Sequence, residues 1–208
     1  MNTMYKTVKR IFDFCSALAL LIIISPVMLV LMVLVRVKLG SPIFFTQMRS
    51  TLGGKDYKLI KFRTMTDARD ANGELLPDEM RKTPFGAWLR NTSLDELPEL
   101  LNIIKGDMSV IGPRSMPVPY NDYYTEYERN RFLVRGGLLP PEILKDNPMP
   151  SWDEQLKWEA DYGKECSLAL DWKIFMKTFQ LLFHRAQEDY GEYTRDTLIN
   201  ERTNKNKE

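Results

Sequence analysis

Histidine and cysteine are nearly absent from this chain of 208 residues, which has one histidine, His184, and two cysteines, Cys15 and Cys166. A single histidine nearly excludes catalytic triads built on histidine and zinc sites that need several of them. The cysteines lie far apart and lack the spacing of a metal site, so we expect no disulfide framework and a reducing compartment. Neither thiol needs a chemical role.

A large net charge is also lacking. The chain carries 29 Lys and Arg against 28 Asp and Glu, a formal net charge of +1. With no recognised binding motif beside it, this balance argues against a nucleic-acid partner. The distribution is uneven, because Arg36 to Arg63 holds seven Lys or Arg and only Asp56 opposes them. We expect this basic zone to lie against anionic membrane phospholipid and to gather phosphates there.

One long apolar run lies near the N-terminus. Phe14 to Val35 holds about 22 residues without a charge, which is long enough to cross a bilayer. No small-residue cleavage site follows it, so a permanent anchor is favoured over a removable signal peptide. Basic residues flank both ends of the run, at positions 6, 9, 10, 36 and 38. Because positive charge marks the cytoplasmic side, a spanning helix would show asymmetry rather than this balance.

The dipeptide Ser25-Pro26 lies in the middle of this run. Proline removes a helix hydrogen bond and clashes with the preceding turn, so we predict a bend there. A bent helix could enter the membrane and return to the same face as a re-entrant anchor. A kinked helix that spans the membrane is the alternative, because membrane helices tolerate proline. Just before the run, Asp13 can pair with Arg10 one helical turn away.

The stretch 92–114 carries the strongest chemical signal. Apolar residues recur at helical spacing over 97–104, which predicts a helix capped by Ser93 or Asp95. The adjacent acids Asp95 and Glu96 would then lie at the positive end of the helix dipole. That position keeps carboxylates ionised and also attracts anionic ligands.

Two interpretations of the acid pair remain open on the local pattern. Adjacent carboxylates can simply cap a helix. Cations bracket the pair on both sides in sequence, however, and acids among arginines point to a divalent metal ion and a phosphorylated substrate. These cations are Arg81, Lys82, Arg90 and Arg114.

The rest of the chain predicts short elements rather than repeats. Strand-like runs at 43–47 and 57–62, joined by a Gly-Gly turn, predict a hairpin. Lys61 and Arg63 emerge at its end, on one face if the strand continues. The segment 120–132 predicts an amphipathic helix, either on the membrane surface or packed against the domain. Further helical patterns cover 152–162 and 172–183, after an irregular loop at 136–150.

We therefore expect a mostly helical α/β protein with a small β-hairpin or sheet, anchored in the membrane by an N-terminal re-entrant helix with a Ser-Pro kink. Residues 1–40 would form that membrane helix. Residues 41–184 would form a cytoplasmic catalytic domain with interfacial helices, and residues 185–208 a charged tail that frays into solvent.

A series of motifs then occurs in the order known from one family. The chain contains KRIFDF, SPVML, LGSPIFFTQMR, KFRTM, TSLDELPELLNIIKGDMSVIGPR and SLALDWKI. Together they resemble the bacterial sugar transferases, the monotopic phosphoglycosyl transferases, in their minimal form. The resemblance covers most of the chain and implies an enzyme on the cytoplasmic face of the bacterial inner membrane. Such an enzyme moves a phosphosugar from a UDP-sugar to polyprenyl (undecaprenyl) phosphate and releases UMP, which initiates glycoconjugate synthesis.

The resemblance also implies residue roles. Asp95 would be the nucleophile that forms a covalent aspartyl-phosphosugar intermediate, and Glu96 its partner, with Mg2+ bound near the pair. Two further sets match family motifs. Lys61, Arg63, Arg90 and Arg114 match the basic residues around the phosphates, and Lys9, Arg10, Asp13, Ser25 and Pro26 match the interface and re-entrant helix motifs.

The chain departs from the family at RGGLLPPEILKDNPMPSWDEQ, where a Pro-Gly-Ile-Thr-Gly type segment and a Gln-rich loop are common. This departure leaves the donor sugar open. The oligomeric state is open too, with a homo-oligomer as one option. Two other functions fit the same features: a metal-dependent hydrolase of lipid diphosphates, and a non-catalytic membrane scaffold.

Overall fold

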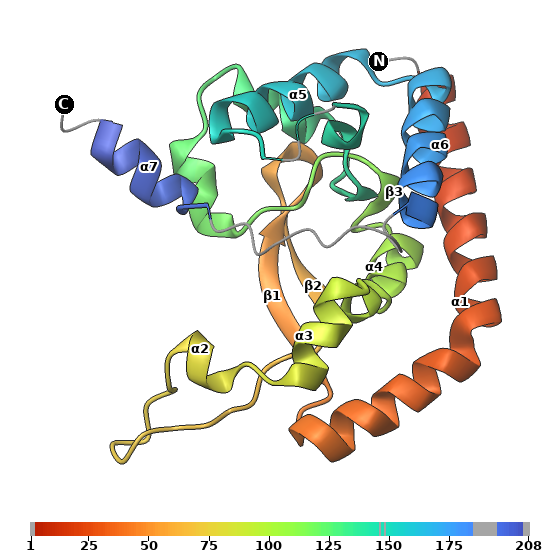
Figure 1. Cartoon of the computed structure of the whole chain (residues 1–208). Helices are drawn as coiled ribbons and strands as arrows, with labels where there is room; N and C mark the ends of the chain where they lie inside the picture. Colours follow the sequence, from red (N-terminus) through yellow and green to blue (C-terminus); the bar gives the residue numbers. More distant parts are fainter. Residues whose placement is uncertain (1–2, 146, 148, 185–194, 206–208) are drawn as a thin grey trace. The chain divides into compact units, whose positions relative to one another are not determined.

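The computed structural model describes residues 3–145, 147, 149–184 and 195–205. The chain forms two compact units. Unit 1 comprises Met1–Asp13, Met48–Tyr57 and Gly106–Glu208, and unit 2 comprises Phe14–Gln47 and Lys58–Lys105. Helices dominate and strands are few (Figure 1). The described residues form two sheets of two strands each, which confirms the prediction of a mostly helical chain with little β-structure.

Three elements carry the chain from one unit to the other: α1 (Thr3–Leu39), β1 (Phe44–Ser50) and β2 (Asp56–Phe62). The predicted hairpin is confirmed, since β1 pairs with β2 around the turn η1 (Leu52–Gly54). Unit 2 continues with four short helices. They are α2 (Asp78–Arg81), α3 (Pro84–Asn91), the 3-10 turn η2 (Leu94–Glu96) and α4 (Glu99–Lys105).

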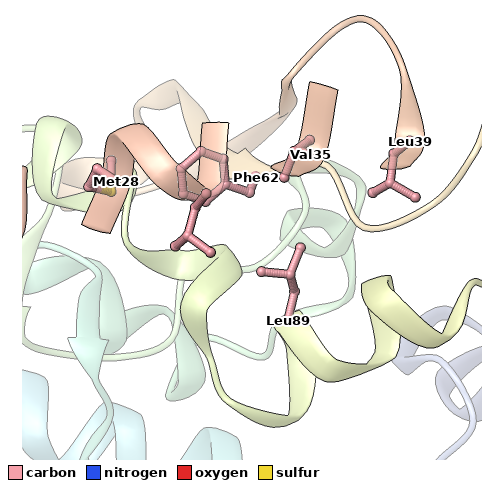
Figure 2. Packing of buried hydrophobic residues seen from close by; sticks show 6 residues of the cluster. Met28, Val35, Leu39, Phe62 and Leu89 are labelled. Atoms are coloured by element: carbon pink, nitrogen blue, oxygen red, sulfur yellow. The ribbon is translucent and has the colours of Figure 1, made fainter. Parts of the chain in front are cut away.

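The core of unit 2 forms on one stripe of α1. Its buried residues recur three or four positions apart, the spacing of a single helix face. These are Met28, Leu31, Val35 and Leu39, and they pack with Phe62 of β2 and Leu89 of α3 (Figure 2). The rings of Phe44 and Phe62 stack at 5.6 Å between centroids. The hairpin and α3 are thereby fixed against the helix, which positions the loop that follows α3.

The remaining faces of α1 are apolar and exposed. Its most apolar window has a mean hydropathy of 3.1 and is only 17% buried, so α1 is long and apolar enough to cross a membrane by length and composition. Pro26 lies inside this helix, and the Ser25 hydroxyl donates to the carbonyl of Ile22 at 2.8 Å. An exposed apolar surface of this kind indicates a nonpolar environment around the helix.

Unit 1 is built from a parallel strand pair and a set of helices. Strand β3 (Ser109–Ile111) pairs with β4 (Gly137–Leu139). The helical elements are the 3-10 turns η3 (Val118–Tyr123), η4 (Glu128–Leu133) and η5 (Pro141–Leu144), followed by α5 (Trp152–Glu165), α6 (Leu168–His184) and α7 (Leu198–Lys205). Helices α5 and α6 confirm the two helical patterns expected there.

Helix α5 is the centre of unit 1. Ser151 and Glu154 form a capping box at its start, and its buried face contributes to two apolar clusters. Trp152 and Leu156 belong to one, and Tyr162 belongs to the other. Gly163 allows a close approach to η4, because a Cβ atom there would lie 2.2 Å from the carbonyl oxygen of Asn130. Only glycine fits at this contact.

Three sequence-based expectations were wrong. The segment 120–132 is not one amphipathic helix but two short 3-10 turns, and buried Tyr124 packs against the domain. The tail does not simply fray: α7 folds back and Leu198 is completely buried, while the expectation for residues 185–194 lies outside the described residues. Ser93 does not cap through its side chain, because its backbone takes a left-handed conformation with φ 54°. In the first two cases the burial of a single apolar side chain, rather than the local sequence pattern, determines the structure.

Candidate active site

The Lys61 ammonium group is the centre of the charged site in unit 2. Lys61 lies near the end of β2, where its Nζ is 2.8 Å from Glu96 Oε1 and 3.2 Å from Glu99 Oε1. Its side chain is only 20% exposed. Burial lowers the pKa of Lys61, but the carboxylates of Glu96 and Glu99 outweigh this effect and the pKa is raised. Lys61 therefore stays charged near neutral pH.

Asn102 brings the lysine and the acids together. Its side-chain amide donates to the Lys58 carbonyl at 2.8 Å, and its oxygen accepts from the Ile60 N–H at 3.1 Å. Asn102 is almost completely buried, so α4 is fixed against β2 by hydrogen bonds shielded from water. Sequence reasoning missed both Asn102 and Glu99. The available signal was a polar residue three positions after an acid on the buried face of a short helix.

Asp95 occupies a tight turn before α4. It lies in η2, is 9% exposed, and follows the left-handed Ser93. Pro98 follows two residues after Glu96, where a missing N–H is tolerated at the start of a helix. Burial raises the pKa of Asp95, and the neighbouring Glu96 raises it further, while Lys61 and Arg90 oppose the rise. Asp95 is thus a desolvated carboxyl group with two cations close by.

Arg63 and Arg90, the two predicted phosphate-binding arginines of unit 2, differ in their surroundings. Arg90 is exposed on α3, and its Nε–H donates to Thr64 Oγ1 at 2.9 Å. Arg63 is 7% exposed, and its guanidinium donates to the carbonyls of Met65 and Ser41. Strand β2 ends at Phe62, so Lys61 and Arg63 do not share the continued strand that the sequence suggested. Arg90 is therefore better placed than Arg63 to meet a phosphate.

Of the remaining predicted residues, Ser25 and Pro26 lie in unit 2 and the others lie in unit 1. Arg114 is exposed and lies three residues after the end of β3. Lys9 pairs with Asp171 at 2.9 Å, and Asp13 accepts hydrogen bonds from the Ser109 hydroxyl at 2.7 Å and the Val110 N–H at 3.0 Å.

Arg10 lies against Gly106. A Cβ atom on Gly106 would be 3.2 Å from Arg10 Nη2. Lys9, Arg10 and Asp13 thus hold the first turns of α1 within unit 1.

The carboxylates around Lys61 are the candidate ligands for a metal ion in unit 2. The described residues contain no cluster of three or more Asp, Glu, His or Cys side chains that could hold a metal ion. Mg2+ does not require such a cluster, because it is often bound by one or two carboxylates together with substrate phosphates. Asp95 and Glu96 supply oxygen ligands of the right kind for that mode.

Comparisons with known proteins identify the family of this chain. A family model described as bacterial sugar transferase matches residues 4–185. The uncharacterized sugar transferase EpsL of Bacillus subtilis (strain 168) is 43% identical over 170 residues, which cover 82% of this chain and 84% of that protein. The chain belongs to the bacterial sugar transferase family, as its motifs implied, and is thereby placed among enzymes.

Two further relatives carry names that state a reaction. A UDP-glucose:undecaprenyl-phosphate glucose-1-phosphate transferase of Caulobacter vibrioides is 31% identical over 189 residues, covering 82% of this chain and 67% of that protein. A UDP-N-acetylgalactosamine-undecaprenyl-phosphate N-acetylgalactosaminephosphotransferase of Aeromonas hydrophila is 32% identical over 189 residues, covering 87% of this chain and 45% of that protein. The chain thus spans less than half the length of the second relative.

Replacing Asp95 with Asn is expected to stabilise the fold in a pH-dependent way. Because the pKa of Asp95 is raised in the folded state, its ionisation destabilises that state. The penalty is absent below the usual pKa of about 4, where the carboxyl is neutral whether folded or not, and complete above the folded pKa. Thermal unfolding of Asp95→Asn should therefore occur at a higher temperature than wild type at pH 8, and the difference should vanish as the pH falls.

Asp78→Asn is the matched control, because Asp78 pairs with Arg81 with its side chain 64% exposed. This change should shift the midpoint little at any pH. An Asp95→Asn variant that melts at or below the wild-type temperature at pH 8 would contradict the assignment of Asp95 as a destabilising buried carboxylate.

Proposed function

We propose that this protein transfers a phosphosugar from a UDP-sugar to polyprenyl phosphate, giving polyprenyl-diphosphate-sugar and UMP, through a covalent intermediate on Asp95. The single observation that carries the proposal is the buried Asp95 carboxyl group beside the Lys61 cluster and Arg90. Family membership and the names of the Caulobacter and Aeromonas relatives support the general reaction.

A covalent step answers a physical difficulty, because both substrates are phosphate anions. Two unit charges about 4 Å apart repel by roughly 4 kcal/mol at an effective dielectric constant near 20. If a carboxylate first takes the phosphosugar, the nucleotide can leave before the lipid phosphate attacks. The two anionic substrates then need not occupy the site together.

The residues of unit 2 would have the following roles in the reaction. An Asp95 oxygen attacks the phosphorus that bears the sugar, forming an Asp–O–P bond while the bond to the UMP oxygen breaks. Burial makes the Asp95 carboxylate a better nucleophile by removing water, and the positive charges of Lys61 and Arg90 keep part of it ionised. Arg90, exposed on α3, would bind the phosphates. An oxygen of polyprenyl phosphate then attacks the same phosphorus and releases Asp95.

Glu96 would act as a partner to Asp95 through its charge and its oxygens. In the described structure its carboxylate is engaged by Lys61. Mg2+, if bound, would be held by Asp95 and Glu96 and would neutralise charge on the phosphates. Arg63 contributes to the shape of the site, since its guanidinium donates to backbone carbonyls and pairs with Asp67 at 3.2 Å.

A location at the cytoplasmic face of the bacterial inner membrane is part of the same proposal. Helix α1 exposes a long apolar surface. In unit 1, α6 exposes a stripe of apolar side chains on one face, with stacked aromatic rings along it, which is typical of a surface in contact with lipid. The stripe consists of Leu168, Trp172, Phe175, Met176 and Phe179. The hydrogen bond from the Ser25 hydroxyl to the Ile22 carbonyl, together with Pro26, supports a bent, re-entrant α1.

The reaction is tested by incubating purified protein in nanodiscs with a panel of UDP-sugars, Mg2+ and polyprenyl phosphate. UMP and a polyprenyl-diphosphate-sugar should form with at least one donor. Asp95→Asn should lower turnover by roughly a thousandfold or more, because the amide cannot act as the nucleophile.

Asp70→Asn, a change on an exposed loop, is the control and should keep full activity. Release of inorganic phosphate from polyprenyl diphosphate would instead identify a lipid diphosphate hydrolase. Product formation by Asp95→Asn at close to the wild-type rate would remove Asp95 from the mechanism.

The topology of α1 is tested by labelling single cysteines with a membrane-impermeant maleimide. In a variant with Cys15 and Cys166 replaced by Ser, one cysteine is introduced at exposed Met4 and, separately, at exposed Asn204 of α7. A re-entrant helix places both positions on the cytoplasmic side, so both should react only after the cells are permeabilised. Labelling of the Met4 position, but not the Asn204 position, in intact cells means that α1 spans the membrane.

A further inference from the structure

Arg114 is held in an unusual way three residues after the end of β3. It is exposed, whereas Ser115 and Met116 after it are buried. Its peptide lies beside Gly137 in a parallel bridge, and the Gly137 N–H donates to the Pro113 carbonyl at 2.8 Å. One side of this short segment is therefore fixed by strand β4.

A buried ion pair holds the other side of the Arg114 segment. The Arg114 N–H donates to Glu159 Oε1 at 3.3 Å, and Arg131 Nη2 donates to the Arg114 carbonyl. Arg131 and Glu159 pair at 2.8 Å, with side chains 3% and 0% exposed. One pair of opposite charges thus binds both polar groups of the Arg114 backbone.

The pair is itself locked in place. The Gln155 amide donates to Glu159 Oε1 at 3.0 Å. Arg131 Nη1 donates to the Tyr124 hydroxyl at 2.5 Å, and its guanidinium lies 4.8 Å from the centre of the Tyr124 ring. Neither member can swing away without losing a buried hydrogen bond.

Stability does not explain such a pair well. Buried ion pairs often contribute no more to stability than apolar residues of the same size, because desolvation offsets their attraction. Here the charges hold one exposed arginine in a fixed backbone geometry, and a fixed arginine recognises a phosphate with less loss of entropy.

We propose that Arg131 and Glu159 are positioning residues that present Arg114 to a phosphate of the nucleotide substrate. The proposal rests on the proposed function, which supplies the phosphate ligand. It adds a role for two buried residues of η4 and α5.

Glu142 is an acidic group whose charge acts on Arg114. Burial and the nearby Glu159 raise the pKa of Glu142 to about 7, against the opposing charges of Arg114 and Arg131. Its buried Oε2 has no hydrogen-bond partner among the described residues. An ionised Glu142 would compete with a phosphate for Arg114, and at slightly acidic pH this competition is small.

The test is UDP binding to the full-length protein in nanodiscs at pH 6.5, measured by calorimetry. The main variant replaces the pair with apolar residues, Arg131→Met with Glu159→Leu, a change that buried pairs often tolerate without loss of stability. It should weaken UDP binding by about tenfold, as should Arg114→Ala. The triple variant should bind no more weakly than Arg114→Ala, because the pair acts only through Arg114.

Glu128→Gln is the matched control. It breaks another ion pair of η4, with Arg202 at 2.6 Å, and none of the hydrogen bonds described for Arg114 involves it. Its UDP affinity should equal that of wild type. Should the apolar pair fail to fold, Glu159→Asp keeps the charge but retracts it by one methylene, and it should still weaken binding.

The outcomes distinguish a failure of the positioning role from a failure of the proposed phosphosugar transfer. Wild-type protein that does not bind UDP overturns both. Wild-type affinity in Arg114→Ala, or in a folded pair variant, overturns the positioning role and leaves the reaction proposed for Asp95 intact. If the triple variant loses as much UDP affinity as the pair variant and Arg114→Ala lose together, the pair does not act through Arg114.

Discussion

The ion cluster at Lys61 is the interaction on which the proposed chemistry depends. One ammonium group lies within 3.2 Å of oxygens from Glu96 and Glu99, in a region where burial makes unpaired charge costly. Without Lys61, burial and the neighbouring Glu96 would raise the pKa of Asp95 further, which favours the neutral form of its carboxyl group. The hydrogen bonds of Asn102 to β2 keep α4, and with it Glu99, at the correct distance.

The proposed role of Asp95 as a nucleophile places conflicting requirements on its carboxyl group. Desolvation strengthens the nucleophile but favours its neutral form, and nearby positive charge restores the ionised form. Asp95 experiences both effects, from burial on one side and from Lys61 and Arg90 on the other. In unit 1, a buried charge pair is used differently, to hold the backbone of an exposed arginine.

Much of this architecture was predictable from sequence, for identifiable reasons. The hairpin, α5 and α6 follow from strong alternation and helical periodicity, and the family follows from its ordered motifs. The short 3-10 turns at 118–133 and the folded α7 did not follow, because they depend on burial of single side chains such as Tyr124 and Leu198. The sequence predicted only part of the candidate active site. Adjacent acids and bracketing arginines mark Asp95, Glu96 and Arg90, but Glu99, Asn102, Arg131 and Glu159 act through contacts distant in sequence.

A covalent phosphosugar on Asp95 can be detected by intact-mass spectrometry after incubation with the donor alone. With a UDP-sugar that supports turnover and no polyprenyl phosphate, we expect release of UMP and a mass increase of one phosphosugar on the protein. Peptide mapping should place it on Asp95, and Asp95→Asn should show none. No adduct, together with UMP release only when both substrates are present, would rule out the covalent intermediate and indicate direct attack by the lipid phosphate.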